Sequence, residues 1–407
     1  METRELAAAV VARAKAYEGE MITFLRKMVA IPSESAQEKA VIDLIASEMR
    51  RAGFDEVKLD ALGNVHGRVG HGPRVIAIDA HVDTVGVSDR GAWAHDPYTG
   101  KVADGYVWGR GAGDQEGGMA AMVYAGRIMK DLGLDDGEFS VWFTGTVQEE
   151  DCDGMCWQYI LKEGVLRPEF VIVTDSTNCR IHRGQRGRME IGVTFKGASC
   201  HASMPHLGDN ALSKLAHAVR AVEELSPRLA NDTFLGRGTI APTFAEVKTP
   251  SVCAVPDHAF LHLDRRVTTG ESADSSLAEV RDALGRAGIA ASVDLLQYDT
   301  PSYTGLRYPV PKYFPTWCLA ENDPLIENAV QTYETLFARA PEVTRWTFST
   351  NGVGIMGTSG VPCFGFGPAA EEDAHSINDR CPIEHLSISA AFYALYPTLW
   401  LARKPRG

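Results

Sequence analysis

Short apolar runs alternate with amphipathic stretches along most of the chain. Residues 37–52 repeat apolar side chains at helical spacing and end before Gly53, which predicts a helix. The run 75–80 is apolar and short, as expected of a strand buried inside a sheet. Alternating strands and helices predict an α/β fold with a mixed, largely parallel sheet and helices on both faces. Strands are predicted at 75–80, 140–147, 170–174 and 363–366, and helices at 4–28, 37–52, 118–129 and 325–337.

The pattern changes between residues 188 and 305. Segments there follow the order strand, helix, strand, strand, helix, strand, which predicts a small α+β domain of ferredoxin-like type. The first pattern resumes after a proline-rich stretch, so we predict that 188–305 interrupt one domain made of 1–187 and 306–407. The inserted strands are predicted at 190–196, 238–247, 259–265 and 290–296, and the helices at 210–225 and 275–287.

Composition narrows the class of protein. The 407 residues carry 40 Lys and Arg against 53 Asp and Glu, a formal net charge of −13, and no concentrated basic segment. This balance argues against nucleic-acid and anionic-membrane partners and favours a small molecule. The first residues show neither a signal peptide nor a spanning helix, and eight scattered cysteines form no C-x-x-C pair. We therefore predict a cytoplasmic protein with reduced thiols.

Titratable residues follow the carboxyl ends of the predicted strands. Taken singly, each has an ordinary explanation, because a His-x-Asp sequence can cap a turn and an acidic run is usually solvated. The carboxyl edge of an open α/β sheet is, however, where ligands bind, so their convergence indicates a site. These residues are His81 and Asp83 after the first strand, Glu149 and Glu150 after the second, Asp175 after the third and His375 after the fourth.

The glycine-dense loop 109–118 adds one short central acid, Asp114, that could bridge two cations. The loop lacks the spacing and the lysine of a phosphate-binding loop, and its acids would repel phosphate. Two histidines and three carboxylates suit a pair of Zn²⁺ ions, and a two-metal centre activates water for displacement at a carbonyl or phosphoryl group. Glu149 is then left as the general base.

Several motifs occur in a fixed order along the chain. They are Asp79 to Thr84 (DAHVDT), Gly109-Arg110-Gly111 followed by Asp114, Glu149-Glu150, Asp175, Gly197 to Ser203 (GASCHAS), Asp264-Arg265-Arg266, and His375 followed by Asn378. This set resembles the co-catalytic zinc metallopeptidases that include aminoacylase, acetylornithine deacetylase, succinyl-diaminopimelate desuccinylase and glutamate carboxypeptidase. Segments 114–118, 147–154 and 346–352 are most similar to the bacterial selenium-metabolism-linked hydrolase subgroup.

The resemblance implies a zinc-peptidase-like fold with two Zn²⁺ ions per subunit, Co²⁺ and Mn²⁺ being alternatives. It implies that Asp83 orients a histidine ligand and that Glu149 carries a proton from the attacking water to the leaving nitrogen. Glu116 and Asp379 depart from the commoner pattern, which has Lys and Glu at these positions. The implied ligands are His81, Asp114 and Asp175 for one ion and Asp114, Glu150 and His375 for the other.

The resemblance also implies a homodimer formed through the inserted lid domain. His201 would reach the partner subunit's site and donate a hydrogen bond to the tetrahedral oxyanion. Arg266 would bind a substrate carboxylate, although pairing with Asp264 is the alternative for this arginine. Asn351 and Gly352 are predicted to bind substrate as well.

These features predict a hydrolase that cleaves a C–N amide bond of an N-acyl amino acid or a related small amide bearing a carboxylate. A dipeptidase or carboxypeptidase and a manganese-dependent N-carbamoyl (ureido) amidohydrolase are the alternatives on the same fold. A non-catalytic binding protein is disfavoured, because loss of catalysis would release Glu149 and Asp83 to change, and both are present.

Overall fold

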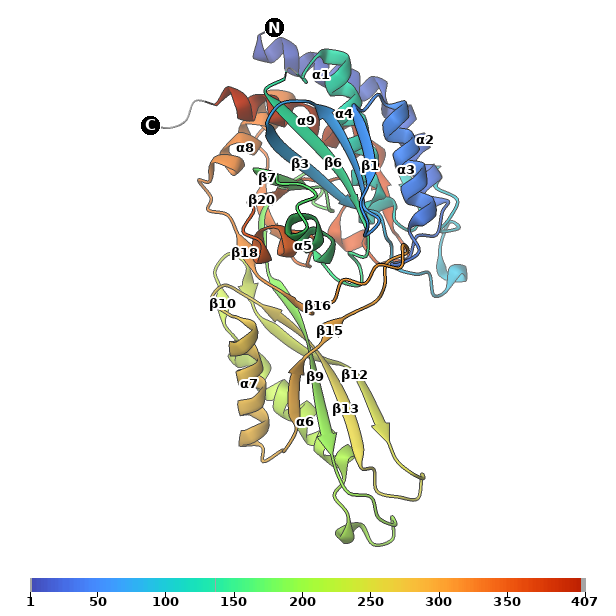
Figure 1. Cartoon of the computed structure of the whole chain (residues 1–407), viewed down its shortest axis with the longest axis vertical. Helices are drawn as coiled ribbons and strands as arrows, with labels where there is room; N and C mark the ends of the chain where they lie inside the picture. The colour runs from blue at the N-terminus through green and yellow to red at the C-terminus, as the bar shows by residue number, and fades with distance from the viewer. Residues whose placement is uncertain (1, 136, 404–407) are drawn as a thin grey trace. The chain divides into compact units, whose positions relative to one another are not determined.

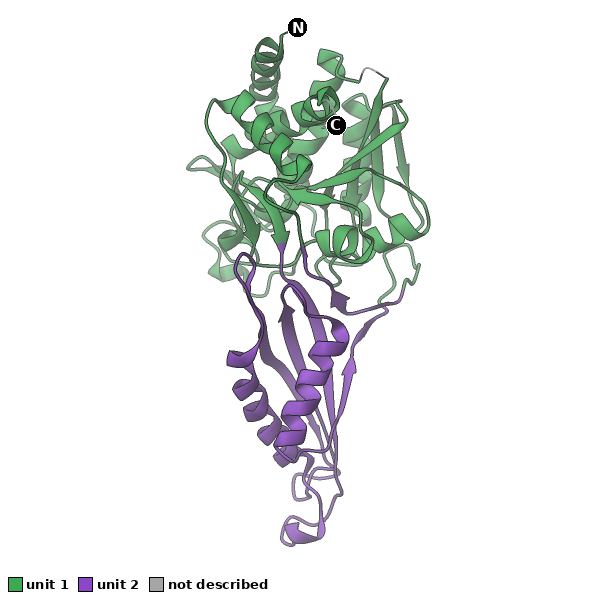
Figure 2. Cartoon of the chain, turned by 90° about the vertical axis from the view of Figure 1, so that its left-hand side faces the viewer, with its two compact units in different colours: residues 1–184, 300–308, 318–407 green, residues 185–299, 309–317 purple. Residues whose placement is uncertain are grey.

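The computed structural model describes residues 2–135 and 137–403. It divides into two compact units: unit 1 comprises Met1–Gly184, Thr300–Tyr308 and Cys318–Gly407, and unit 2 comprises Gln185–Asp299 and Pro309–Trp317 (Figure 2). The predicted insertion, 188–305, has different boundaries. Residues 300–308 stay with unit 1, where the Tyr303 hydroxyl donates to the Gly63 carbonyl. Residues 309–317 return to unit 2, because 313–314 pair with 188–189.

Unit 1 is built on a mixed nine-stranded sheet in the described part of the chain. Its strands are β1 (Glu56–Leu59), β2 (Val65–Gly70), β3 (Arg74–His81), β6 (Phe139–Thr146), β7 (Phe170–Val173), β8 (Ile181–Gln185), β18 (Trp317–Cys318), β19 (Val343–Trp346) and β20 (Cys363–Gly365). They run in the order β1-β2-β6-β3-β7-β20-β8-β18, with β19 also paired to β8. The four central strands, β6, β3, β7 and β20, are parallel, which confirms the predicted sheet (Figure 1).

Seven helices of unit 1 lie within the described residues. They are α1 (Thr3–Ala16), α2 (Glu18–Val29), α3 (Lys39–Arg51), α4 (Gly117–Leu132), α5 (Met155–Lys162), α8 (Pro324–Phe337) and α9 (Ile383–Ala402). A small second sheet comprises β4 (Lys101–Ala103), β5 (Tyr106–Trp108) and β21 (Arg380–Pro382). The single helix predicted at 4–28 is interrupted at Tyr17, whose buried ring packs against Tyr124 and whose hydroxyl donates to Asp131.

The strand register decides which face each side chain occupies. Ile76 of β3 lies beside Phe170 of β7, and Ile172 of β7 lies beside Phe364 of β20. Neighbours in register share a face, so these four apolar side chains form one surface. Helix α9 covers it, with the Tyr396 ring centroid 5.6 Å from that of Phe170 and 5.1 Å from that of Phe364.

The opposite face of the sheet carries a buried polar network around Asp79 of β3. The Asp79 carboxylate accepts hydrogen bonds from Thr144, Thr146 and Asn351 at 2.8–3.1 Å. Cys156 of α5 donates its S–H to Asn351 Oδ1 across 3.1 Å. Helix α5 and the turn at Asn351 therefore pack on this face, which confirms that helices cover both sides of the sheet.

Helix α9 was not predicted from the sequence. Most of its side chains, including Leu386, Phe392 and Leu395, are fully buried, so its apolar residues do not follow the one-sided helical period. Among the described residues, none of the helices combines the length and the apolar character needed to cross a bilayer.

Unit 2 has the predicted order of strands and helices. These are β9 (Gly187–Lys196), α6 (Ala211–Leu225), β12 (Thr239–Lys248), β13 (His258–Val267), α7 (Ala273–Arg286) and β14 (Ser292–Leu295), with β17 (Tyr313–Phe314) added beside β9. The sheet order is β12-β13-β9-β14 and all its pairings are antiparallel. Two short ribbons join β10 (Asn231–Asp232) to β11 (Gly236–Arg237) and β15 (Gln297–Tyr298) to β16 (Val310–Pro311).

The core of unit 2 lies between its sheet and its two helices, which Figure 2 shows on one side of the sheet. Side chains of β13 alternate between buried and partly exposed. Leu261 and Leu263 belong to the core with Val222 of α6 and Val280 of α7. The other face of β13 is therefore free to carry polar groups such as His262.

We expect the Ile172→Ala substitution to destabilise unit 1 by about 2–5 kcal/mol, because it leaves a cavity under α9 at a fully buried position. The measurement is the midpoint of thermal unfolding by circular dichroism. Leu59→Ala on β1 is the control, because Leu59 is 44% exposed and should cost less than about 1 kcal/mol. Equal losses in the two variants would contradict the assignment of the core.

Candidate metal centre

The parallel strands bring the predicted site residues to one edge of the sheet. His81 is the last residue of β3 and lies in register with Thr146, the last residue of β6. Glu149 and Glu150 follow β6 within four residues, so they lie at the same edge as His81. Asp114 comes from the tight turn Ala112–Glu116 directly before α4, and its own backbone is non-helical, with φ −119° and ψ 93°.

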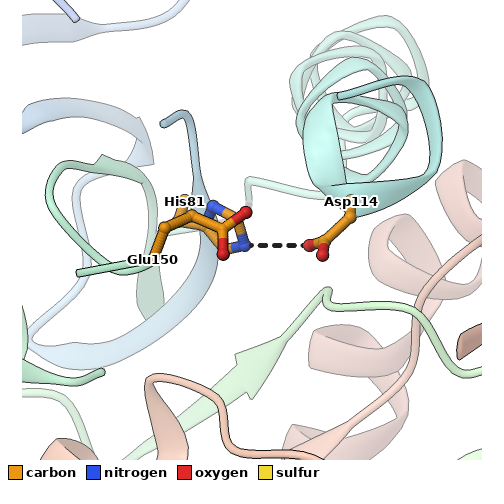
Figure 3. A group of neighbouring side chains, drawn as sticks. All are labelled: His81, Asp114 and Glu150. Atoms are coloured by element: carbon orange, nitrogen blue, oxygen red, sulfur yellow. Dashed lines mark hydrogen bonds and ion pairs between the residues drawn. The ribbon is translucent and has the colours of Figure 1, made fainter. Parts of the chain in front are cut away.

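His81, Asp114 and Glu150 form the cluster shown in Figure 3. Each offers one ligand atom, and these atoms lie within 4.8 Å of one another. His81 Nε2 is 3.1 Å from Asp114 Oδ1. His81 is 1% and Asp114 6% exposed, so both groups are removed from water.

His375 completes the arrangement from the C-terminal part of the chain. Its Nε2 atom lies 3.2 Å from Asp114 Oδ2 and 2.8 Å from Glu150 Oε2. The two oxygens of Asp114 therefore face two different imidazoles, Oδ1 towards His81 and Oδ2 towards His375. A carboxylate that bridges two metal ions needs this arrangement.

Electrostatic interactions within the cluster are strong. Burial opposes ionisation of Asp114, but the hydrogen bonds with His375 and His81 outweigh it and hold the pKa of Asp114 well below its usual range. Hydrogen bonds to Asp114 and Glu150 raise the pKa of His375 to about 10. Burial, and then the Asp114 charge, raises the pKa of Glu150 to about 7.

Asp175 and Glu149 border the cluster and are also buried. One oxygen of Asp175 accepts the Ser176 N–H at 2.8 Å, and burial and then the Asp114 charge raise its pKa well above the usual range. Glu149 Oε2 lies 3.8 Å from His81 Nε2. Burial is also the main cause that raises the pKa of Glu149 well above its usual range.

The residues present fit a metal centre. Glu149 Oε1 and Glu150 Oε1 are buried oxygens with no hydrogen-bond partner among the described residues. Buried carboxylate oxygens without partners are costly unless a cation binds them. Imidazole nitrogens and carboxylate oxygens together are a typical zinc donor set. The structure brings four ligand candidates, His81, Asp114, Glu150 and His375, into one charged cluster. Asp175 is buried and feels the Asp114 charge, and its role as a ligand stays a prediction.

Asp83 acts on the site differently from the sequence expectation. His81 Nδ1 lies 2.9 Å from the main-chain oxygen of Asp83 and 3.7 Å from its carboxylate. The carboxylate instead accepts the backbone N–H groups of Glu149 and Glu150, each at 3.0 Å. Asp83 thus holds the tautomer of His81 through its carbonyl and the position of the two glutamates through its side chain.

Asp379, which was predicted only as a departure from the family pattern, supports the turn that carries Asp114. Its carboxylate accepts the backbone N–H groups of Gly111 and Gly113 at 2.7 Å each and pairs with Arg110 at 3.1 Å. A Cβ atom added at Gly113 would lie 2.8 Å from the Arg380 backbone oxygen and 3.1 Å from this carboxylate, so the turn needs glycine for close approach.

His201 and Arg266 belong to unit 2. His201 is exposed, and its Nδ1 atom accepts the Ser203 backbone N–H at 3.1 Å, which leaves the hydrogen of the neutral ring on Nε2. Arg266 forms a bidentate pair with Asp264 through Nε and one terminal nitrogen, at 2.7 and 3.2 Å. The predicted roles of His201 and Arg266 towards substrate stay predictions.

Asn351 lies in the polar network under the sheet. Its exposed fraction is 1%, its amide nitrogen donates to Asp79 and Thr146, and its oxygen accepts from Gly154 and Cys156. These bonds give Asn351 a structural role in joining α5 to β3. Its predicted contact with substrate, and that of the buried Gly352 beside it, stay predictions.

Comparisons with known proteins agree with the geometry. Residues 77–398 match the family described as Peptidase family M20/M25/M40. The Uncharacterized protein YgeY of Escherichia coli strain K12 is 50% identical over 393 residues, which cover 97% of each chain. The succinyl-diaminopimelate desuccinylase of Rhodospirillum centenum is 26% identical over 387 residues, which cover 91% of this chain and 89% of the relative.

A solved structure shares the fold. The Bacillus subtilis YXEP protein, described as a dinuclear metal binding peptidase from the M20 family, gives a TM-score of 0.69 at 14% identity and covers 95% of this chain and 99% of its own. The finer resemblance to the selenium-metabolism-linked subgroup stays a prediction. The resemblance to the wider metallopeptidase family is confirmed: this chain belongs to peptidase family M20/M25/M40 and is a hydrolytic metalloenzyme.

Proposed function

We propose that this protein is a di-zinc amidohydrolase that cleaves the C–N amide bond of an N-acyl amino acid or a related small amide. The observation that carries the proposal is the Asp114 carboxylate, which faces His81 with one oxygen and His375 with the other. Glu149 lies beside this pair with a buried oxygen that has no partner among the described residues.

Two divalent cations fit the donor set. His81, Asp114 and Asp175 would hold one ion, and Asp114, Glu150 and His375 the other, with Co²⁺ and Mn²⁺ as alternatives to Zn²⁺. When bound, such ions polarise a carbonyl group and lower the pKa of water to near neutrality.

The side chains of this protein supply proton transfer and orientation. Glu149 accepts a proton from the attacking water and gives it to the leaving nitrogen, so that one buried carboxylate acts first as base and then as acid. His201 of a second subunit donates its Nε2 hydrogen to the oxyanion of the tetrahedral intermediate. Arg266 retains N–H groups that Asp264 does not use, and these bind a substrate carboxylate.

The desuccinylase relative supports an N-acyl amino acid as the substrate class. The direct test is a panel of N-acetyl, N-succinyl and N-carbamoyl amino acids and dipeptides, assayed with protein reconstituted with each metal. Hydrolysis of the N-acyl compounds is expected. Cleavage of dipeptides alone or of N-carbamoyl compounds alone would contradict the N-acyl substrate class and identify the corresponding alternative enzyme. An absence of turnover with two metals bound would indicate a binding protein.

A homodimer through unit 2 is part of the proposal. Strand β12 is an edge of its sheet and pairs only with β13 in the described part of the chain. Phe244 and Val247 on this strand are 59% and 37% exposed. An exposed apolar edge strand is a favourable surface for pairing with a second copy. We also propose a cytoplasmic location, in line with the absence of any disulfide bond among the cysteines of the described residues.

We expect Glu149→Gln to lower kcat by at least about 100-fold, because the amide cannot carry the proton. Metal content should remain at two ions per subunit, as measured by atomic emission. Glu163→Gln is the control, because it removes an exposed carboxylate without altering the site. A loss of less than about 100-fold with both metals bound would refute the general-base role.

Metal binding should stabilise the protein more at about pH 8 than at about pH 6. The pKa of Glu150 is raised to about 7 by burial and by Asp114, and that of His375 to about 10 by its hydrogen bonds to Asp114 and Glu150. Groups with pKa values raised by folding stabilise the protein below their unfolded pKa, and this stabilisation is lost as pH rises through the folded value. The metal-free site therefore loses stability between about pH 5 and pH 10, whereas cation binding displaces the protons.

The measurement for this prediction is the difference in Tm between metal-loaded and chelator-treated protein at both pH values. The Asp114→Ala variant should show little difference at either pH, because it removes the bridging carboxylate. A Tm difference that is equal at the two pH values, or larger at the lower one, would contradict the prediction.

Subunit mixing tests the role of His201. Inactive Glu149→Gln and His201→Ala proteins, refolded together, should regain about a quarter of wild-type activity, since half of the dimers contain one intact composite site. Each variant refolded alone is the control. If mixed dimers form, as shown by native mass spectrometry, and no activity returns, His201 does not act across the interface.

A further inference from the structure

Four consecutive backbone N–H groups at the end of β6 donate to buried side chains. The donors are residues 147–150, the turn that carries Glu149 and Glu150. Val147 N–H donates to Asn64 Oδ1, Gln148 N–H to Glu38 Oε1, Glu149 N–H to Asp83 Oδ1 and Glu150 N–H to Asp83 Oδ2, each at 3.0 Å. Side chains from three separate segments thus fix the backbone of this turn.

Glu38 is the unexpected member of this set. It immediately precedes α3, yet its side chain makes no capping hydrogen bond to that helix. It is 0% exposed, and the described residues place no cation against it in an ion pair. Its Oε1 atom accepts the backbone N–H of Ala36 at 2.9 Å and that of Gln148 at 3.0 Å, which ties the loop before α3 to the turn after β6.

The backbone bond to Glu38 falls at the least favourable residue of the turn. Gln148 has φ +58°, a left-handed conformation that is disfavoured for residues with a Cβ atom. This conformation sets the direction in which the next two residues leave the strand. Glu149 Oε2 consequently lies 3.8 Å from His81 Nε2, and Glu150 Oε2 lies 2.8 Å from His375 Nε2.

An unpaired buried carboxylate is costly to a folded protein, whereas an apolar side chain of similar size would not be. The hydrogen bonds that Glu38 accepts from Ala36 and Gln148 neither cap α3 nor contribute to the apolar core. They hold the one residue whose conformation aims the proposed base and a proposed metal ligand.

We propose that Glu38 is a positioning residue that holds Gln148 in its left-handed conformation and so aims Glu149 and Glu150 at the metal centre. The predicted effect of Glu38 on turnover rests on the proposed function. Its effect on metal affinity is independent of the substrate, because Glu150 is a ligand candidate by geometry.

The test compares Glu38→Leu and Glu38→Ala, which remove the acceptor, with Glu38→Gln, which keeps an oxygen acceptor and cannot ionise. Asp43→Ala is the matched control, because Asp43 is a carboxylate on α3, the helix that Glu38 precedes, and is 57% exposed and paired with Lys39 at 2.6 Å. Metal affinity is measured by competition with a chromophoric chelator using Zn²⁺ alone. Tm, kcat and KM are measured on the same preparations.

We expect Glu38→Leu and Glu38→Ala to weaken Zn²⁺ binding by about 10–100-fold and to lower kcat by a similar factor at saturating Zn²⁺, with KM changed less than about threefold. Glu38→Gln should recover most of both properties, and Asp43→Ala should match the wild type. A lower Tm with unchanged Zn²⁺ affinity would show that Glu38 is merely structural and would overturn the proposal.

Equal impairment of Glu38→Gln and Glu38→Leu would also overturn it, since the hydrogen bond would then not be the cause. If no substrate is hydrolysed by the wild type, the Zn²⁺ affinities still decide the inference. Because glutamine occupies the same volume, the Glu38→Gln protein gives a folded comparison even if one truncated variant does not fold.

Discussion

The Asp114 carboxylate is the contact on which the arrangement of the site depends. Its oxygens face His81 at the end of β3 and His375 after β20, so segments from both ends of unit 1 meet at one buried acid. The acid remains ionised because its two imidazole partners outweigh the effect of burial on its pKa. The parallel pairing of the central strands brings these partners to the same edge. Loss of either the carboxylate or the register would therefore separate the two halves of the site.

The turns around this contact are held by the same type of interaction, hydrogen bonds from backbone N–H groups to buried carboxylates. Asp83 accepts two N–H groups of the turn that carries Glu149, Glu38 accepts a third, and Asp379 accepts two from the turn that carries Asp114. Each is a buried carboxylate bonded to main-chain donors. At Asp83 and Glu38, main-chain N–H groups satisfy the carboxylate without an Arg or Lys partner among the described residues, whereas Asp379 also pairs with Arg110. The turns that carry Glu149 and Asp114 can thus be rigid while the carboxylates of the cluster stay available to a metal ion.

The sequence predicted the parts of this site that follow from strand geometry. His81, Glu149 and Asp175 come directly after apolar runs, and a parallel sheet must bring such positions together. Glu38 and Asn64 could not be predicted in this way. Glu38 contacts the turn across 110 positions of sequence and binds a backbone group, which leaves no pattern of residue types. The sequence predicted that Asp83 orients His81, but spacing alone does not distinguish the main-chain oxygen contact that the structure shows from a carboxylate contact.

The same limit applies to Asn351, whose four hydrogen bonds lie in the core beneath β3. Its motif did not indicate this structural role, and its substrate contact stays a prediction. Burial is a property of the assembled sheet. A polar residue in a glycine-rich segment has the same appearance in the sequence whether it faces a ligand or closes a buried network. Asp79 gave the only available signal, because an acid inside an apolar strand needs a buried donor such as an asparagine amide.

The spacing of the cluster gives the strongest physical support for a metal ion. Two ligand atoms bound to one tetrahedral zinc at about 2.0–2.2 Å lie about 3.3–3.6 Å from each other. The contacts of Asp114 with His81 and His375 are 3.1 and 3.2 Å, and that of His375 with Glu150 is 2.8 Å. The donor atoms therefore need to separate by about 0.1–0.8 Å to admit a cation. Burial, and then the Asp114 charge, raises the pKa of Glu150, so a cation would relieve the cost of burying these carboxylates side by side.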